Sequence, residues 1–532
     1  MTVNKIVALL VLTIISLSVF PVNYTSPKPV ACDIAVYTDT RVADLVKIVD
    51  QDFESFFNEK KYVSRSSGLA ITKQSMGNGD LLVWFRVEHN SPKSFIDMDF
   101  TVGQISGPIR YWKHEDYMDR SEYAGDNINS RYRLSQVGGV SAKHDKGPAL
   151  FEFGANKPSI FISRTGRFRP CPVGLLKSVD CKQDANIIFG NNSIKIRIFL
   201  EPTTSEFEEG FVLVSNSRLL DLENQRNHTF LVSHDLWRVK PLLSDGWWLS
   251  AQSGFFEGAD GDCYYPNPGF YAAKSMLMWY CQLDNRFFYD IVLTNMKMAY
   301  EKARMEGFAR MPIMPVYFTG MYGGFIDYVD TRFSTDGVRF LIKCAKLLDS
   351  QKARLVIPEL ARYYADNFDD ISIDIDGDGS YLISDYIFDS TTKPKVHASL
   401  NHTLCIINYL LEYEDVTGDK SCSWVVDKLV ESLNKTSTKW AKPNGDLWYG
   451  YFPTVNGFSN DDYSFLTNND LIECARLLER VRKASSPGIM ELLKTKRNYL
   501  EAQGLIKKKQ PSVLKGFKES DAMIINGSSI SH

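Results

Sequence analysis

The sequence predicts a multidomain fold with both α and β structure, in which an antiparallel β-sandwich is followed by an α/α-toroid, a ring of helical hairpins. Apolar residues recur with a period of two over roughly residues 66–245 and with a helical period from Pro268 onward. The chain has 532 residues, 44% of them hydrophobic. This is enough to bury the cores of two or three domains.

Changes in this pattern divide the chain into five predicted segments. They are an export signal or membrane anchor with its linker (1–31), an N-terminal helical segment (32–65), the β-sandwich (66–250), the α/α-toroid (251–503) and a flexible tail (504–532). The tail has no apolar periodicity and ends in Gly and Ser residues, so we expect it to be loosely ordered.

The N-terminal segment predicts export from the cytoplasm. Lys5 precedes an apolar run from Ile6 to Val22, which is typical of a signal sequence. The run is about 17 residues long, slightly short of a comfortable membrane span. The small residues Val30-Ala31 lie far downstream for cleavage, so an uncleaved anchor is the alternative, and a lipid-anchored Cys32 is a weaker one. We expect an extracytoplasmic protein, secreted or held at the cell surface, that meets the membrane only through this segment.

Two patterns precede residue 250. Apolar residues between Val42 and Lys61 are spaced as on one helix face, which predicts a helix. Farther on, Ile96, Met98 and Phe100 alternate with polar residues, as in a strand that buries one face. Similar runs occur at 81–87, 159–163, 194–198 and 211–214, separated by Gly, Asn and Pro. Many short strands with turns between them fit an antiparallel sandwich.

Three apolar stripes with helical spacing follow in the last 200 residues. They are Val338, Leu341, Ala345 and Leu348; Leu400, Leu404, Ile407 and Leu411; and Leu471, Cys474, Leu478 and Val481. Each stripe opens a unit of helix, second helix and aromatic loop, so the chain contains a degenerate repeat of roughly 65 residues. A ring of such hairpins collects the ends of its inner helices around one cavity.

Composition favours a carbohydrate partner over a nucleic acid. The formal net charge is −3 without a basic block, whereas nucleic-acid binding requires a concentrated positive surface. Nine Trp and 26 Tyr residues could stack on the flat faces of sugars, but composition alone favours plain core packing for them.

Cysteine spacing and short motifs exclude several other classes. Nine cysteines cannot all pair within one chain, and none has zinc-ligand spacing. We expect a disulfide between Cys171 and Cys181, and buried thiols at Cys344, Cys405 and Cys474. Neither a glycine fingerprint for a nucleotide cofactor nor a metalloprotease or serine-hydrolase motif is present.

One loop has the spacing of a calcium site. Asp374, Asp376 and Asp378 occupy positions one, three and five, a carbonyl of Ser380 would add a ligand at position seven, and Asp385 stands at position twelve. The loop resembles the calcium loops of dockerin modules. We therefore expect a structural Ca²⁺ ion, with a solvated acidic turn as the alternative.

A motif series in the last third carries a family resemblance. It runs Leu400-Asn401, Thr417-Gly418-Asp419, Trp448-Tyr449-Gly450-Tyr451, Asp462-Tyr463 and Asn469-Asp470-Leu471. This order resembles the C-terminal domain of D-glucuronyl C5-epimerases over about residues 330–480. That family has a β-rich region before an α/α-barrel and inverts C5 of uronic acids within a polysaccharide.

The resemblance implies catalytic tyrosines. Tyr463 matches the tyrosine of the family's Asp-Tyr motif, and Tyr449 or Tyr451 matches its earlier loop tyrosine. Because C5 lies next to a carboxylate, an acid and a base on opposite ring faces can remove and return its proton. Without the resemblance, these tyrosines would be interpreted as aromatic residues lining a cavity.

Further candidates surround this series. The substrate-binding candidates are Asn401, His402, Arg332, Asp336, Asn469 and Trp448, with Arg332 expected to hold the substrate carboxylate. The family's acidic Glu-Tyr segment corresponds poorly to the stretch Asp385 to Asp389 here. If the scaffold performs glycoside hydrolysis instead, Asp336, Asp389 and Asp470 could supply its carboxylates.

The sequence therefore predicts an extracytoplasmic protein acting on an acidic polysaccharide, with epimerase-like proton abstraction as the leading hypothesis. A polysaccharide lyase or glycoside hydrolase on the same scaffold, and a non-catalytic, calcium-stabilised glycan-binding protein, are the alternatives, since a fold alone does not determine the reaction.

Overall fold

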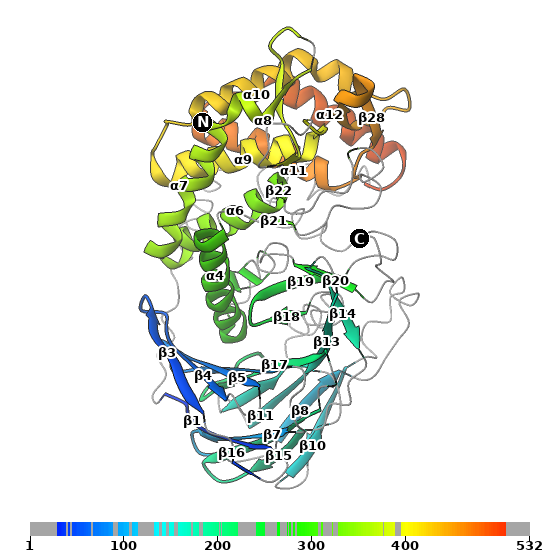
Figure 1. The fold of residues 1–532 in the computed structure, drawn as a ribbon. Helices are drawn as coiled ribbons and strands as arrows, with labels where there is room; N and C mark the ends of the chain where they lie inside the picture. Colours follow the sequence, from blue (N-terminus) through cyan, green and yellow to red (C-terminus); the bar gives the residue numbers. More distant parts are fainter. Residues whose placement is uncertain are drawn as a thin grey trace, which may run out of the picture. The chain divides into compact units, whose positions relative to one another are not determined.

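A computed structural model shows extensive antiparallel sheets and several helices (Figure 1). The residues it describes are 29–38, 41–42, 45–64, 68–88, 94–105, 109–114, 132–137, 141–144, 148–153, 158–171, 174–179, 185–201, 203, 205–221, 241–250, 263–266, 274, 276–277, 280–281, 285–306, 310–311, 322, 328–375, 377–388 and 395–506. Contacts divide the chain into two compact units. Unit 1 comprises residues 1–267 and 272–297, and unit 2 comprises residues 268–271 and 298–532.

Unit 1 contains two antiparallel sheets. The smaller has the order β10 (Ser141–His144), β15 (Ala185–Phe189), β16 (Ser193–Leu200), β7 (Ser94–Thr101), β1 (Ala31–Thr38) and β2 (Arg41–Val42). The larger runs β18 (Leu242–Leu243), β19 (Gly246–Ser250), β20 (Cys263–Pro266), β14 (Leu176–Val179), β13 (Gly166–Pro170), β17 (Phe207–Ser215), β12 (Ser159–Ile162), β11 (Ala149–Phe153), β8 (Ile109–His114) and β9 (Tyr132–Val137). A branch from β17 adds β6 (Leu81–Val87), β5 (Leu69–Met76), β4 (Phe57–Ser64) and β3 (Val46–Phe53).

The two sheets enclose one apolar core. Ile96, Met98 and Phe100 of β7 are almost completely buried, and they pack in the same cluster as Val83 of β6 and Val212 of β17. The intervening residues of β7 point out of this core, as the alternating sequence requires. The strands predicted from alternation are therefore confirmed.

The predicted helix between Val42 and Lys61 is wrong. This stretch forms β3 and β4, which are joined at a turn where Glu54 has a positive φ of 52°. Val46 and Ile48 are 56% and 53% exposed on β3. The spacing imitated a helix, but β-branched residues favour an extended backbone, and the ladder with β4 satisfies the backbone groups of both strands.

A buried polar contact attaches helix α4 (Arg286–Glu306) to the larger sheet of unit 1. Arg286 Nη2 lies 2.9 Å from Asp80 Oδ1, and the Asn78 side-chain amide donates to Asp290 Oδ1 over 2.8 Å. Burial, followed by the nearby Asp80 carboxylate, raises the pKa of Asp290 well above its usual value. The first half of α4, through Lys297, thus belongs to the β-rich unit, although the sequence predicts it in the helical domain.

Unit 2 is mostly helical. Its helices are α6 (Thr331–Leu348), α7 (Gln351–Asp366), α8 (Phe368–Ile371), α9 (Leu400–Thr417), α10 (Ser423–Thr436), α11 (Leu466–Leu477) and α12 (Pro487–Ala502), with short turns η4 (Ser437–Trp440), η5 (Pro453–Val455) and η6 (Leu478–Arg482). Its small sheets are β21 (Arg310–Met311), β22 (Tyr328–Asp330) and β25 (Tyr386–Ile387); β23 (Ser372–Asp374) and β24 (Tyr381–Ile383); and β26 (Ala398–Ser399), β27 (Trp448–Phe452) and β28 (Gly457–Asp461).

The three predicted apolar stripes lie on the buried faces of α6, α9 and α11 with η6, where only Val481 of the stripe residues is half-buried. Helix α9 packs against both α6 and α11, and α7, α10 and α12 follow them as second helices. Cys344, Cys405 and Cys474 are buried thiols on these faces, as predicted. The Cys171–Cys181 pairing is untested because Cys181 lies outside the described residues.

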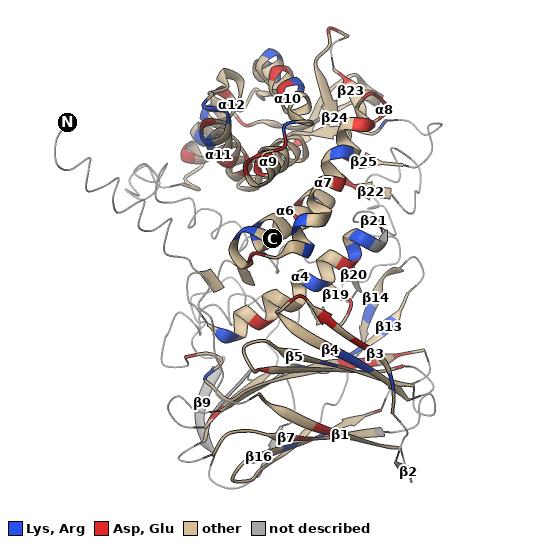
Figure 2. Cartoon of the chain, turned by 90° about the vertical axis from the view of Figure 1, so that its left-hand side faces the viewer, with Lys and Arg blue, Asp and Glu red and all other residues tan. Residues whose placement is uncertain are grey.

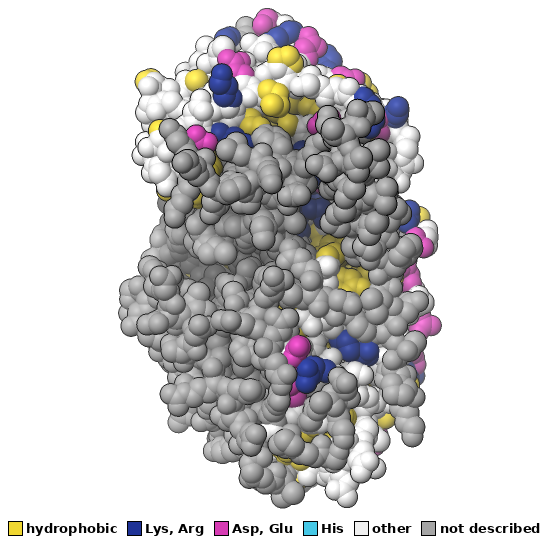
Figure 3. All heavy atoms as spheres, turned by 180° about the vertical axis from the view of Figure 1, so that it is seen from behind, with side chains coloured by type: hydrophobic (Ala, Val, Ile, Leu, Met, Phe, Trp, Pro, Cys, Tyr) yellow, Lys and Arg dark blue, Asp and Glu magenta, His cyan; other side chains and the backbone are white. Residues whose placement is uncertain are grey.

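Surface charge is mixed over the helical unit. Lys and Arg lie beside Asp and Glu on α10 and α12 (Figure 2). The described side chains visible in Figure 3 likewise intersperse hydrophobic and charged groups. Within the described residues, no helix is both long and apolar enough to cross a membrane; the predicted N-terminal signal lies outside them.

Candidate functional site

The first turns of α6, α9 and α11 meet inside unit 2, where a buried arginine joins them. Arg332 Nε lies 2.7 Å from Asp336 Oδ2 on α6, and Nη2 donates to Asp470 Oδ1 of α11 over 3.2 Å. Its Nη1 donates to the carbonyl of Asn401 on α9 over 2.9 Å and also contacts Asp470 Oδ2. Arg332 is only 8% exposed, so this guanidinium is committed to protein acceptors.

A second arginine lies two turns further along α6. Arg339 is 1% exposed, and its Nε lies 2.8 Å from Glu412 on α9, while Nη2 lies 2.6 Å from Glu473 on α11. The two arginines thus tie the same three helices together at successive levels. Ion pairs around a buried arginine fix geometry, because removal of the carboxylates leaves an uncompensated charge.

The centre of the site is Asp385, which is completely buried just before β25. Its Oδ1 accepts the backbone N–H of Ser399 over 2.7 Å. Around Oδ2 lie His397 Nε2 at 3.1 Å, the donating hydroxyl of Tyr449 at 3.3 Å and His402 Nε2 at 3.6 Å. One carboxylate therefore connects a strand-end loop, the start of α9 and β27.

The hydrogen-bond network assigns the tautomer of His402. The Thr331 hydroxyl donates to the backbone carbonyl of Asp385 over 2.9 Å, so its oxygen accepts from His402 Nδ1 over 2.8 Å. Nδ1 then carries the proton, and Nε2 presents a lone pair toward Asp385 Oδ2. Because both facing atoms are acceptors, a proton that arrives between them is stabilised by both groups.

His397 also lies beside the Asp385 carboxylate, near the same oxygen as His402. Its Nδ1 lies 3.2 Å from the hydroxyl of Tyr322, which also accepts the backbone N–H of His397 over 3.1 Å. A hydroxyl proton directed at Nδ1 places the imidazole proton on Nε2, where it faces Asp385. This arrangement orients the carboxylate.

The pKa values of the titratable groups at this site are shifted in different directions. Burial lowers the pKa of His402 to about 4, so this imidazole is neutral at pH 7. Burial would raise the pKa of Asp385, but the positive charge of His402 and His397 in their protonated forms, together with hydrogen bonds from His397 and Ser399, outweighs burial and lowers that pKa. Burial raises the pKa of Asp330, which caps α6 through the N–H of Phe333, to about 7. Opposed shifts of this kind are typical of acid–base sites.

The two tyrosines predicted from the Asp-Tyr motif and the earlier loop lie together. The rings of Tyr449 and Tyr463 are edge to face, with centroids 5.9 Å apart. Tyr449 is 8% exposed and Tyr463 is 39% exposed, so the second ring is the accessible one. Burial, followed by Asp385 and Asp462, raises the pKa of Tyr463, which keeps this phenol protonated at neutral pH.

Tyr451 does not share this position. Its hydroxyl donates to Asn456 Oδ1 over 2.6 Å, and its ring packs against Phe458. Of the two alternatives for the loop tyrosine, the geometry therefore favours Tyr449.

Other predicted residues are distributed around the cluster. Asn401 is 3% exposed at the start of α9, and its side-chain oxygen has no hydrogen-bond partner within the described part of the chain. Asn469 is the fourth residue of α11. Trp448 is the first residue of β27, and Lys442 Nζ lies 4.9 Å from its ring centroid. Asp389 lies outside the described residues.

Two expectations about charged side chains need correction. Arg332 is bonded to Asp336 and Asp470, so the three groups stabilise the helix starts, and this geometry does not leave Arg332 to hold a substrate carboxylate. Asp385 does not close the predicted calcium loop, because both of its oxygens face the groups around Ser399 and Tyr449.

Of the other calcium-loop residues, Asp374 ends β23, and Asp378 and Ser380 lie between it and β24. Asp374 Oδ1 accepts the N–H of Gly377 over 2.9 Å, and Asp378 Oδ1 accepts the N–H of Ser380 over 3.1 Å. Asp376 lies outside the described residues. Among those that are described, no group of three or more His, Cys, Asp or Glu side chains is arranged to hold a metal ion.

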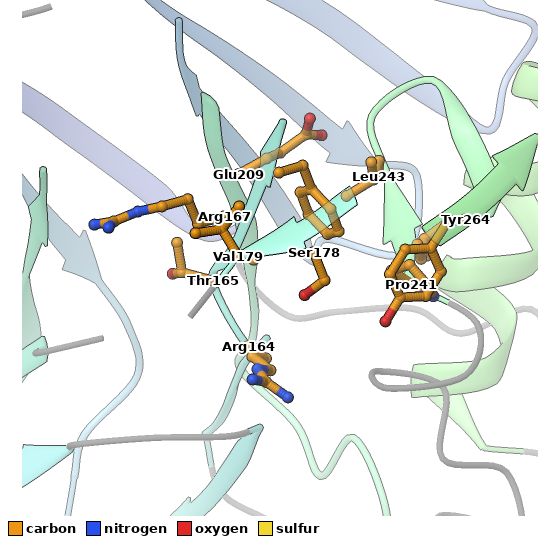
Figure 4. Close-up of a pocket in the computed structure, with 12 residues that line it drawn as sticks. Arg164, Thr165, Arg167, Ser178, Val179, Glu209, Pro241, Leu243 and Tyr264 are labelled. Atoms are coloured by element: carbon orange, nitrogen blue, oxygen red, sulfur yellow. The ribbon is translucent and has the colours of Figure 1, made fainter. Parts of the chain in front are cut away.

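Unit 1 contains a separate small pocket between β13, β14 and the β18–β20 region. Its lining includes Arg164, Arg167, Glu209 and Tyr264 (Figure 4). In this view the guanidinium of Arg167 points away from Tyr264, and it lies 2.5 Å from Glu208. The Arg167 guanidinium is thus paired with a neighbouring carboxylate.

Comparisons with known proteins give only distant likenesses. No family model and no curated protein matches the chain. Solved structures that resemble it include unsaturated glucuronyl hydrolase from Bacillus sp. GL1 (9% identity, 48% of this chain and 72% of that chain, TM-score 0.32), cellobiose 2-epimerase from Bacillus thermoamylovorans (9%, 44% and 59%, 0.32) and a family 76 glycoside hydrolase from Bacteroides thetaiotaomicron (8%, 77% and 75%, 0.36).

These structures are carbohydrate-processing enzymes by their names. This chain spans 59% of the cellobiose 2-epimerase chain, less than two thirds of its length. Likenesses with TM-scores of 0.32 to 0.36 carry no argument about this protein's reaction, which must come from its own residues.

Sequence reasoning missed the centre of the site. Asp385 was assigned to calcium, and His397, Thr331 and Tyr322 received no role. A signal was present: Asp385-Tyr386 is an acidic residue followed by tyrosine, upstream of Leu400-Asn401 as the family resemblance requires. The 13 residues between Tyr386 and Leu400 obscured the correspondence.

The low pKa of His402 predicts a pH-dependent contribution to stability. The folded pKa of about 4 lies below the reference value of 6.5, so the unfolded chain binds more protons between these values. Stability from this group is complete above pH 6.5 and is lost as the pH falls toward 4, by on the order of 3 kcal/mol.

Chemical denaturation of wild-type protein and His402→Gln from pH 7 to pH 4 measures this effect. The difference between their unfolding free energies should shrink across that window, which isolates His402 from the other titrating groups. A constant difference would contradict the assigned neutral state.

Proposed function

We propose that this protein inverts C5 of uronic acid residues within a polysaccharide by abstracting and returning a proton. The observation that carries the proposal is the Tyr449 hydroxyl directed at the buried Asp385 carboxylate, with the more exposed Tyr463 beside the Tyr449 ring. A buried phenol that donates to a buried carboxylate, beside a second and more accessible phenol, suits a reaction that needs both an acid and a base.

The proton balance assigns different roles to the two tyrosines. The Tyr449 proton moves to the Asp385–His402 pair, and the resulting phenolate removes the C5 proton. Tyr463, whose pKa is raised, donates its proton to the other face of the planar intermediate. Tyr463, which is 39% exposed, then takes a proton from solvent. On the base side, Tyr449 releases the C5 proton to solvent and regains its own proton from the buried pair, so the net proton count is unchanged.

A second candidate reaction uses the carboxyls with opposed pKa shifts. Asp330 has a pKa of about 7, whereas that of Asp385 lies below its ordinary value, and the residue after Asp385 pairs with Asp330 across β22 and β25. A protonated and an ionised carboxyl are the groups that glycoside hydrolysis requires. Burial of both, at 6% and 0% exposure, makes this reaction the second choice.

The proposal also covers the fold of unit 2, the partner of the site and the location of the protein. We infer that the paired helices of unit 2 belong to an α/α-toroid, that the partner is an acidic polysaccharide and that the protein acts outside the cytoplasm. The repeated helical hairpins support the toroid. The tyrosine-rich site supports the polysaccharide partner, and the N-terminal signal pattern supports the location.

Incubation with uronate polymers in deuterated water tests the reaction directly. Wild-type protein should introduce deuterium at C5, and Tyr463→Phe should lower the rate by about 10²–10⁴ while polymer affinity stays nearly unchanged. Tyr451→Phe is the matched control, because its hydroxyl is bonded to Asn456, and it should retain wild-type exchange.

Chain shortening or unsaturated ends without C5 exchange would favour the hydrolase or lyase alternative. Wild-type exchange by Tyr463→Phe would remove this residue from the mechanism. Absence of exchange and cleavage across a broad panel of uronate polymers would contradict the enzymatic proposal.

We also propose a structural calcium ion at the turn between β23 and β24, held by Asp374, Asp376, Asp378 and the Ser380 carbonyl. A ligand that binds only the folded state at about a hundredfold excess over its Kd adds about 2.7 kcal/mol. Calcium should therefore raise the melting temperature of wild-type protein above that in chelator at matched ionic strength.

Two aspartate variants control this measurement. Asp378→Asn should reduce the shift, whereas Asp370→Asn, an exposed carboxylate outside the loop, should preserve it. Equal melting temperatures of the wild type with calcium and with chelator would contradict the proposed ion.

A further inference from the structure

A fully buried lysine lies at the base of the hairpin that carries the loop tyrosine. Lys496 of α12 has 0% side-chain exposure, and its Nζ lies 2.7 Å from Asp446 Oδ1 and 2.8 Å from Asp462 Oδ2. Asp446 stands two residues before β27, and Asp462 directly follows β28. One ammonium group thus contacts both ends of the β27–β28 hairpin.

The same two ends carry the tyrosines of the site. Tyr449 is the second residue of β27, and Tyr463 immediately follows Asp462. The Asp462 carboxylate is fixed further, since its Oδ1 accepts the Thr467 hydroxyl of α11 over 2.6 Å. The ring-to-ring contact of the tyrosines therefore depends on where the two hairpin ends are held.

Contacts at the strands themselves constrain the hairpin from its other side. Gly450 pairs with Ser399 across β26 and β27, and a Cβ at Gly450 would lie 2.9 Å from the carbonyl oxygen of Ala398. Strand β27 is thus closely apposed to the segment that leads into α9. This contact fixes the strand, but it does not reach Asp462 or the backbone of Tyr463.

We propose that Lys496 is a positioning residue, whose ammonium group draws the two ends of the β27–β28 hairpin together and thereby sets the relative placement of Tyr449 and Tyr463. A buried ammonium is stable only while its carboxylates surround it, so a displaced hairpin end would leave a charge uncompensated. The link from this geometry to turnover rests on the proposed function, whereas the link to hairpin order does not.

Three full-length variants distinguish local positioning of the hairpin from a general contribution to the stability of the fold. Lys496→Met keeps the side-chain length and removes the charge, Lys496→Arg keeps the charge, and Lys435→Met removes an exposed lysine that pairs with Glu431 on α10. Hydrogen–deuterium exchange mass spectrometry follows peptides that cover residues 446–463, with α6 and α9 as internal references. Deuterium incorporation at C5 of a uronate polymer is measured in parallel.

In Lys496→Met, amide exchange in residues 446–463 should rise at least tenfold while α6 and α9 stay protected, and C5 exchange should fall by about 10²-fold. Lys496→Arg should retain most of the amide protection of residues 446–463 and most of the C5 exchange. Lys435→Met should match the wild type in both measurements. If Lys496→Met does not fold, Asp446→Asn removes one contact only and should raise exchange in the same peptides.

Unchanged protection of residues 446–463 in a folded Lys496→Met protein would overturn the proposal, as would loss of protection spread equally over α6 and α9. Local loosening with no C5 exchange even in the wild type would leave hairpin positioning supported and would count against the proposed function alone.

Discussion

Arg332 lies where the first turns of α6, α9 and α11 meet, and its guanidinium bonds to a carboxylate of α6, a carboxylate of α11 and a carbonyl of α9. Removing one partner of such a buried set costs about 3–5 kcal/mol, so the helix starts are held in one arrangement. Thr331 and His402 stand in these same first turns. The positions of the groups around Asp385 therefore depend on Arg332 and its two carboxylates.

A fixed polar arrangement also explains how a buried carboxylate can serve as a base. The Ser399 amide and His397 orient Asp385, while the neutral His402 presents a second acceptor to any arriving proton. These groups need little rearrangement during proton transfer, and this preorganisation is a large part of catalysis in sites that exclude water. Tyr449 connects the buried base to the accessible Tyr463.

Local patterns predicted many of the strands of unit 1 and the three helical stripes, because burial imposes a period on the sequence. The two tyrosines followed from the family resemblance instead, and their roles stay a prediction. Local patterns failed where strand pairing, or polar contacts between residues far apart in the sequence, determine the structure. Val42 to Lys61 has helical spacing but forms a strand pair, since its ladder partners are fixed by tertiary structure. Asp385 has the correct spacing for calcium, yet its partners His402 and Tyr449 are 17 and 64 residues away, and no local pattern shows that they converge.

The most direct test of the central claim, that Asp385 accepts the proton relayed by Tyr449, is C5 deuterium incorporation by Asp385→Asn. This isosteric change keeps the side-chain shape and an oxygen that can accept the Ser399 N–H, but it replaces Oδ2 with an amide nitrogen and so removes the capacity as a base. We predict a loss of about 10²–10⁴ in exchange rate with retained helical structure and polymer affinity. Exchange at the wild-type rate in a folded Asp385→Asn protein would contradict the account.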